Sequence, residues 1–74
     1  MNARDVDLWK VFAVGHTKVV HVPQGRGEAL RVHLASHGIV SKVSPVAAAP
    51  FERLELADDA NPATVQAIID NWSR

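Results

Sequence analysis

The amino-acid sequence predicts an α+β fold of two layers, in which two helices cover one face of a mostly antiparallel sheet. The clearest observation is an apolar stripe at helical spacing, which follows Asn61 and Pro62, two residues typical of a helix start. A second helical pattern ends at Gly38, and segments rich in strand-forming residues lie before and between the two patterns. The predicted order of elements is therefore strand, strand, helix, strand, strand, helix.

The first strand is predicted within residues 8–14, which are rich in aromatic and β-branched side chains. A helix is the alternative, because Asn2 is a suitable N-cap and Gly15 is a suitable helix end. We favour the strand because Gly15-His16 fits a two-residue type II′ turn, with residues 17–22 as the returning strand.

This hairpin register decides which side chains share a face, because side chains alternate along a strand. One face is wholly apolar and is expected to meet the helices, and the other is mixed and is expected to be the outer face. The register pairs Val11 with Val20 and Trp9 with Val22 on the first face, and Phe12 with Val19 and Lys10 with His21 on the second.

The first helix is predicted from about Gly27 to His37, where Leu30 and Leu34 form its buried pair. Gly38 then supplies the left-handed residue that commonly stops a helix. A tight turn containing a second glycine leads into this helix, and Gly27 would let helix and sheet approach closely.

Two further strands and a helix complete the prediction. The third strand is expected over Ile39–Val43, followed by a proline-bounded loop over residues 44–50. The fourth is expected over Phe51–Ala57, where strict alternation turns two leucines inward and Arg53 and Glu55 outward. The last helix spans Asn61–Trp72, and its apolar stripe consists of Val65, Ile68, Ile69 and Trp72.

Assembled with a right-handed crossover, these elements predict a ferredoxin-like sandwich whose outermost strand comes first in the chain. With 74 residues, we expect a single domain over residues 1–74, comprising an N-terminal extension, 1–16, and a βαββα core, 17–73. The 47% hydrophobic and 22% charged residues are typical of a globular protein.

The charge balance and the absence of cysteine limit the expected partners and compartment. Eight basic residues balance eight acidic ones, so bulk charge draws the chain neither to nucleic acid nor to anionic lipid. There is no cysteine, which fits a reducing compartment. The sequence has neither a signal-peptide pattern nor the ~20 apolar residues of a membrane span. We therefore expect a cytoplasmic protein with no membrane attachment.

Three stretches carry a family resemblance, namely Val19-Val20-His21-Val22, Leu34 with Ser36-His37-Gly38-Ile39, and Leu54-Glu55-Leu56 leading to Val65 and Ile68-Ile69. With them, residues 18–72 resemble a small prokaryotic family of strand-helix-strand-strand-helix domains described as candidate signal-transducing proteins of unknown function. The chain departs from that pattern in carrying residues 1–16 in front and Gly27 where the family prefers a small non-glycine residue. The resemblance implies a role in binding or regulation and supplies no catalytic residues.

Two constellations near the first helix have ligand chemistry. His33 and His37 are four residues apart and could direct two imidazoles at one metal ion, although a site would need further ligands from His16, His21 or a carboxylate. We expect instead two half-buried histidines and no metal or other cofactor.

The turn before that helix is a candidate anion site. Gly25, Arg26 and Gly27 would offer free amides and a guanidinium to a small anion or a nucleotide phosphate. Against this, Glu28 repels anions, and neither the dinucleotide fingerprint nor the P-loop pattern is complete.

The outer face of the sheet is the candidate interface, and it would consist of Lys10, Phe12, Val19, His21 and Arg53, with Glu55 beside them. RNA could stack on such a face, but with one aromatic side chain and zero net charge this binding is disfavoured. No nucleophile, base or paired acid has a catalytic setting, so we expect no enzyme. The sequence favours a small binding or regulatory module acting through protein contacts, including self-association.

Overall fold

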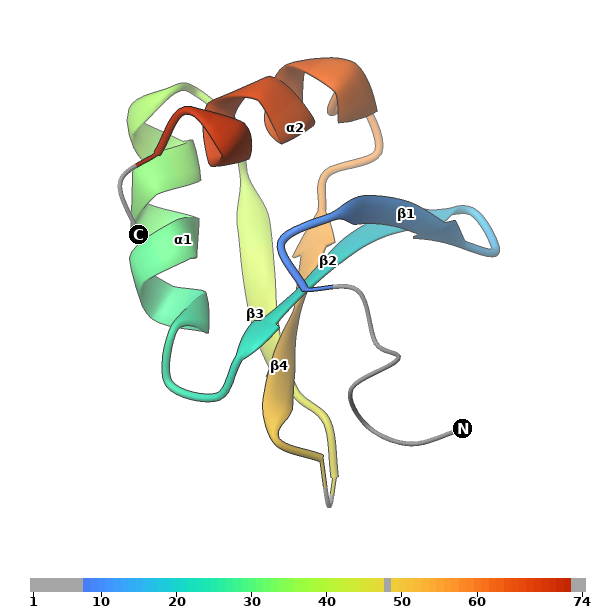
Figure 1. Cartoon of the computed structure of the whole chain (residues 1–74). Helices are drawn as coiled ribbons and strands as arrows, with labels where there is room; N and C mark the ends of the chain where they lie inside the picture. The colour runs from blue at the N-terminus through green and yellow to red at the C-terminus, as the bar shows by residue number, and fades with distance from the viewer. Residues whose placement is uncertain (1–7, 48, 73–74) are drawn as a thin grey trace.

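The computed structural model describes residues 8–47 and 49–72 and confirms the predicted α+β class and order of elements (Figure 1). The elements are β1 (Val11–Val14), β2 (Thr17–Pro23), α1 (Gly27–Ser36), β3 (Ser41–Pro45), β4 (Phe51–Leu56) and α2 (Pro62–Asp70). The strands form one antiparallel sheet in the order β1-β2-β4-β3. Because β2 and β3 both pair with β4, they run parallel to each other, and α1 connects them.

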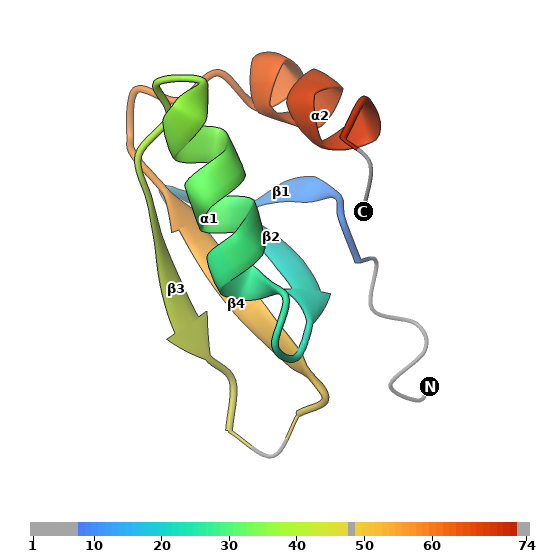
Figure 2. The same ribbon diagram turned by 90° about the vertical axis from the view of Figure 1, so that its left-hand side faces the viewer.

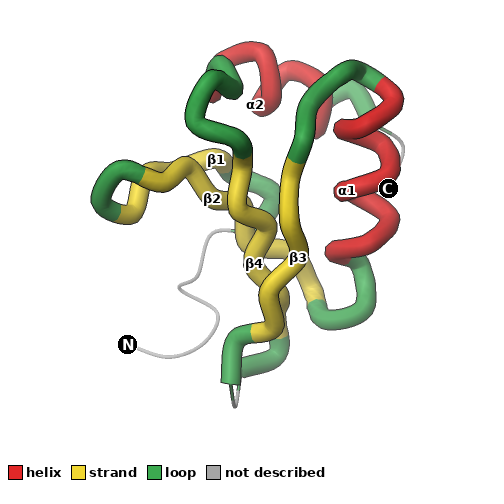
Figure 3. The backbone as a smooth tube through the Cα atoms, turned by 180° about the vertical axis from the view of Figure 1, so that it is seen from behind, coloured by secondary structure: helices red, strands yellow, loops and turns green. Residues whose placement is uncertain are grey.

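Both helices pack their buried side chains onto the same side of this sheet. Figure 2 shows α1 running in front of the sheet along β3 and β4, while α2 lies across the end of the sheet above β1. Figure 3 shows the same arrangement from behind. The shared core consists of Val20, Val22, Leu30, Leu34, Leu54, Leu56, Val65 and Ile69.

The stripe of the last helix is confirmed, and so is its cap. Val65 and Ile69 are fully buried, while Ile68 and Trp72 pack against the core from its rim. The Asn61 side chain accepts hydrogen bonds from the first-turn amides of α2, at 2.9 and 3.2 Å. The helix itself is shorter than predicted and ends at Asp70.

The first hairpin has the predicted strand rather than the alternative helix, and the N-cap considered at Asn2 lies outside the described residues. Gly15 has a φ of +62°, and Trp9 is the only described non-glycine residue with a positive φ, so the turn has the glycine-first geometry of type II′. Val11 pairs with Val20, and Phe12 with Val19, as predicted.

The predicted continuation of this ladder to Trp9 and Lys10 is wrong, because β1 begins only at Val11. Trp9 adopts a φ of +66°, which turns the chain, and its amide donates to the His21 carbonyl at 2.8 Å. Leu8 then makes an isolated parallel bridge to His21. Lys10 therefore does not pair with His21, nor Trp9 with Val22, in the antiparallel ladder.

The predicted strand Ile39–Val43 begins two residues too early, because Ile39 takes part in the end of α1. The Gly38 amide donates to Ala35 and the Ile39 amide to Leu34, both at 2.9 Å, which is the Schellman pattern of a helix stop. Ile39 therefore belongs to the helix end, and β3 runs from Ser41 to Pro45, into the predicted loop. Pro45 is tolerated because β3 is an edge strand.

Gly27 confirms the expected close approach of helix and sheet. A Cβ at this position would lie 2.6 Å from Glu52 Oε1, 2.9 Å from Val43 Cγ1 and 3.4 Å from Leu54 Cδ1. Only glycine lets α1 begin this close to β3 and β4.

Candidate functional site

The outer face of the sheet carries a compact group of side chains around His21, which lies in the middle of β2. We call Phe12, His21, Phe51 and Arg53 the outer-face cluster. The imidazole centroid lies 5.0 Å from the Phe12 ring and 4.6 Å from the Phe51 ring. Arg53 is the cross-strand partner of His21, and its Nε donates to His21 Nε2 at 3.2 Å.

The imidazole of His21 is held neutral by its surroundings. Only 8% of the residue is exposed, and burial, followed by the positive charge of Arg53, lowers the pKa of His21 below its ordinary value of 6.5. Since Nε2 accepts from Arg53, the ring proton of the neutral form lies on Nδ1. The cluster therefore presents one cationic group, the Arg53 guanidinium, among aromatic rings.

The structure brings together three of the five residues predicted for the interface, namely Phe12, His21 and Arg53. Val19 is on the same face but is only 1% exposed, so its side chain is buried beneath its neighbours and offers almost no surface to a partner. Lys10 is exposed and precedes β1. Sequence reasoning missed Phe51, although strand alternation signals it, because Phe51 shares its face with Arg53.

The free edge of β1 adjoins this cluster, and α2 covers part of it. The Val11 amide donates to Gln66 Oε1 at 2.8 Å, and Gln66 Nε2 donates to the Trp9 carbonyl at 3.0 Å. The Val11 amide points away from β2. Because backbone orientation alternates along a strand, the amide and carbonyl groups of Ala13 point away from β2 as well. Gln66 thus caps the start of the edge and leaves the stretch around Ala13 open within the described chain.

Exposed apolar side chains lie beside this open stretch. Phe12 is 36% exposed and Val14 is 46% exposed, and both are on the outer face of β1. Large exposed apolar side chains next to an unpaired edge are features of a surface that pairs with another chain.

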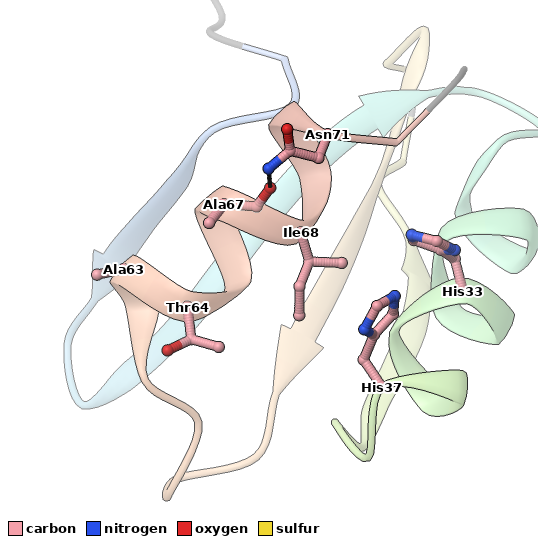
Figure 4. Close-up of a pocket in the computed structure, with 7 residues that line it drawn as sticks. All are labelled: His33, His37, Ala63, Thr64, Ala67, Ile68 and Asn71. Carbon is pink, nitrogen blue, oxygen red and sulfur yellow. Dashed lines mark hydrogen bonds between the residues drawn. The ribbon is translucent and has the colours of Figure 1, made fainter.

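A hollow lies between α1 and α2, on the side of the molecule opposite the outer-face cluster (Figure 4). Its volume is about 550 Å³. His33 and His37 form one wall, and the other wall is lined by Ala63, Thr64, Ala67, Ile68 and Asn71 of the last helix and its end. Within residues 8–47 and 49–72, no group of three or more histidine, cysteine or acidic side chains is placed to hold a metal ion. His21, one of the further ligands considered, belongs instead to the outer-face cluster.

The predicted anion turn has a different local arrangement from the one that an anion needs. Gly25 adopts a φ of +89°, and Arg26 is the N-cap residue without a side-chain capping bond. The amide of Gly27 donates to Glu52 Oε1 at 2.9 Å. A carboxylate from β4 therefore already occupies the place where a phosphate would meet this helix start.

Comparisons of the chain with models of known protein families, with curated proteins and with solved structures find no match. Within the described parts of the chain, neither helix has the length and apolar content needed to cross a membrane.

Proposed function

We propose that this chain is a small protein-interaction module that self-associates through β1 and the outer-face cluster. The observation that carries the proposal is the open edge around Ala13, with Phe12 and Val14 exposed beside it. Phe12 at this edge, and Phe51 and Arg53 on β4 of the same face, belong to residue types that are enriched at protein interfaces.

A second copy is the partner that this edge fits best. A single strand edge is self-complementary, because two copies related by a two-fold axis can pair antiparallel. Pairing centred on Ala13 would set Phe12 of each copy opposite Val14 of the other, on the same face. Because the net charge of the chain is zero, two copies do not repel each other at long range.

Sedimentation of the full chain over a concentration series tests the proposal. The wild type should form a dimer that Phe12→Glu disrupts, because a charge would be buried among apolar side chains. The matched control is Val32→Glu, which places the same charge at a 53% exposed valine on α1 and should leave the dimer intact. A wild type that stays monomeric at high concentration would refute self-association, and so would equal disruption by both variants.

We also infer that the fold is a ferredoxin-like sandwich whose last strand has moved to the start of the chain. The sheet order β1-β2-β4-β3, and the parallel pair β2 and β3 joined by α1, support this relation. A regulatory role for the module rests on the resemblance of residues 18–72 to the candidate signal-transducing domains.

RNA binding on the same face has less support than a protein partner. The rings of Phe12 and Phe51 already pack on His21, at interplanar angles of 65° and 48°. The zero net charge also gives no electrostatic attraction to a phosphate backbone. We therefore propose a protein partner for this face.

A further inference from the structure

We propose that His33 and His37 form a two-ligand site for a late first-row divalent metal ion such as Zn²⁺, Ni²⁺ or Cu²⁺. The two residues lie one turn apart on α1, and their ring centroids are 4.9 Å apart. Figure 4 shows both rings projecting from α1 toward the same hollow. Imidazole nitrogen is the ligand that these ions favour, and spacing of four residues on a helix is a recurrent way to present two of them.

Trp72 orients the first of these ligands. Its ring stacks on His33 with centroids 4.7 Å apart and an interplanar angle of 11°, and it also makes an edge-on contact with Trp9 at 6.0 Å. A metal ion binds an imidazole nitrogen in the plane of the ring, so a stack on the ring face does not block coordination. Because this packing already restricts the His33 ring, the side chain loses less conformational entropy when it binds a metal, and this favours binding.

The hollow gives the ion room for its remaining ligands. Small side chains of α2, Ala63 and Ala67, line the wall opposite the histidines, and the space is about 550 Å³. No carboxylate lines this hollow in the described chain, so the protein supplies two ligands. Water would complete the coordination, or a donor atom from outside the chain.

This site does not depend on the proposed self-association. The histidines line the hollow between α1 and α2, whereas Phe12 and Arg53 lie on the outer face of the sheet. Failure of one proposal therefore leaves the other standing.

Titration of the full chain with ZnCl₂ and NiCl₂, followed by the histidine ring signals in NMR spectra, tests the site. We expect saturable changes of the His33 and His37 signals, and Ni²⁺ should also quench tryptophan fluorescence because Trp72 lies against His33. His33→Gln and His37→Gln should each weaken metal binding by more than roughly tenfold, which is the loss of affinity when a residue that only supports a metal ligand is replaced.

The matched control is His16→Gln, which removes an exposed imidazole from the hairpin turn and should leave the affinity unchanged. His37 is exposed, so its replacement should leave the fold intact, as far-ultraviolet circular dichroism would verify. Changes that do not saturate at millimolar metal would overturn the proposal. Unchanged affinity in His37→Gln would overturn it as well, and so would an equal loss in His16→Gln.

Discussion

Replacement of Gly27 by alanine tests how tightly α1 is seated on the sheet. In an exposed helix this change stabilises by up to ~1 kcal/mol, because glycine is a poor helix former. At Gly27 the new methyl group would meet Val43 Cγ1 at 2.9 Å and Glu52 Oε1 at 2.6 Å. The Glu52 side chain can swing away, although its bond to the Gly27 amide is then lost, whereas the β-branched Val43 is stiff.

Overpacking of a well-packed core costs about 1–3 kcal/mol, so the clash exceeds the gain in helix propensity. We expect the free energy of unfolding to fall by about 1–2 kcal/mol, after the gain in helix propensity is subtracted. For a domain of this size each kcal/mol corresponds to a fall of about 4–8 °C in Tm. Urea unfolding followed by tryptophan fluorescence measures the first quantity, and a thermal scan the second.

A double-mutant cycle identifies the cause of the loss. In a Val43→Ala background the main stiff obstacle is gone, so Gly27→Ala should cost clearly less than in the wild type. If Gly27→Ala proves as stable as the wild type, or if its cost is the same in both backgrounds, the close seating of α1 on β3 and β4 is not what requires glycine.

Two further predictions concern pH and helix capping. Because the pKa of His21 is lowered in the folded state, the unfolded chain binds protons more readily, so this contribution to stability is complete above about pH 6.5 and is lost as the pH falls below it. Urea unfolding at about pH 7.5 and 5.5 should therefore show a smaller fall in stability for His21→Gln than for the wild type, and an equal fall would contradict this account. Asn61→Ala should lower the free energy of unfolding by roughly 0.5–2 kcal/mol by removing the cap of α2, whereas Asn61→Asp should retain most of it in thermal scans.

Local signals in the sequence were sufficient for much of the fold. The Asn61 cap, the stripe of α2 and the glycine stop at Gly38 are patterns of adjacent residues, and each predicted its element. The register of Val11 with Val20 followed from the two-residue turn and strand alternation. These features are decided within a few residues, where propensity and periodicity are informative.

The missed features depend on contacts between distant parts of the chain. The positive φ of Trp9 accompanies bonds to His21 and to Gln66, which no pattern near Trp9 indicates. The inward carboxylate of Glu52 meets Gly27 only when α1 has packed on β4. For the same reason, the stack of Trp72 on His33 depends on how α1 and α2 lie relative to each other, which the sequence does not specify, because Trp72 follows the end of α2.

The side chain of Gln66 links the last helix to the start of the first hairpin. Its hydrogen bonds reach Val11 and Trp9, which are 55 and 57 positions away in the sequence. During synthesis the two hydrogen bonds that cover the start of the β1 edge therefore cannot form until Gln66 has left the ribosome. Until then the nascent chain exposes a longer unpaired strand edge than the folded chain does.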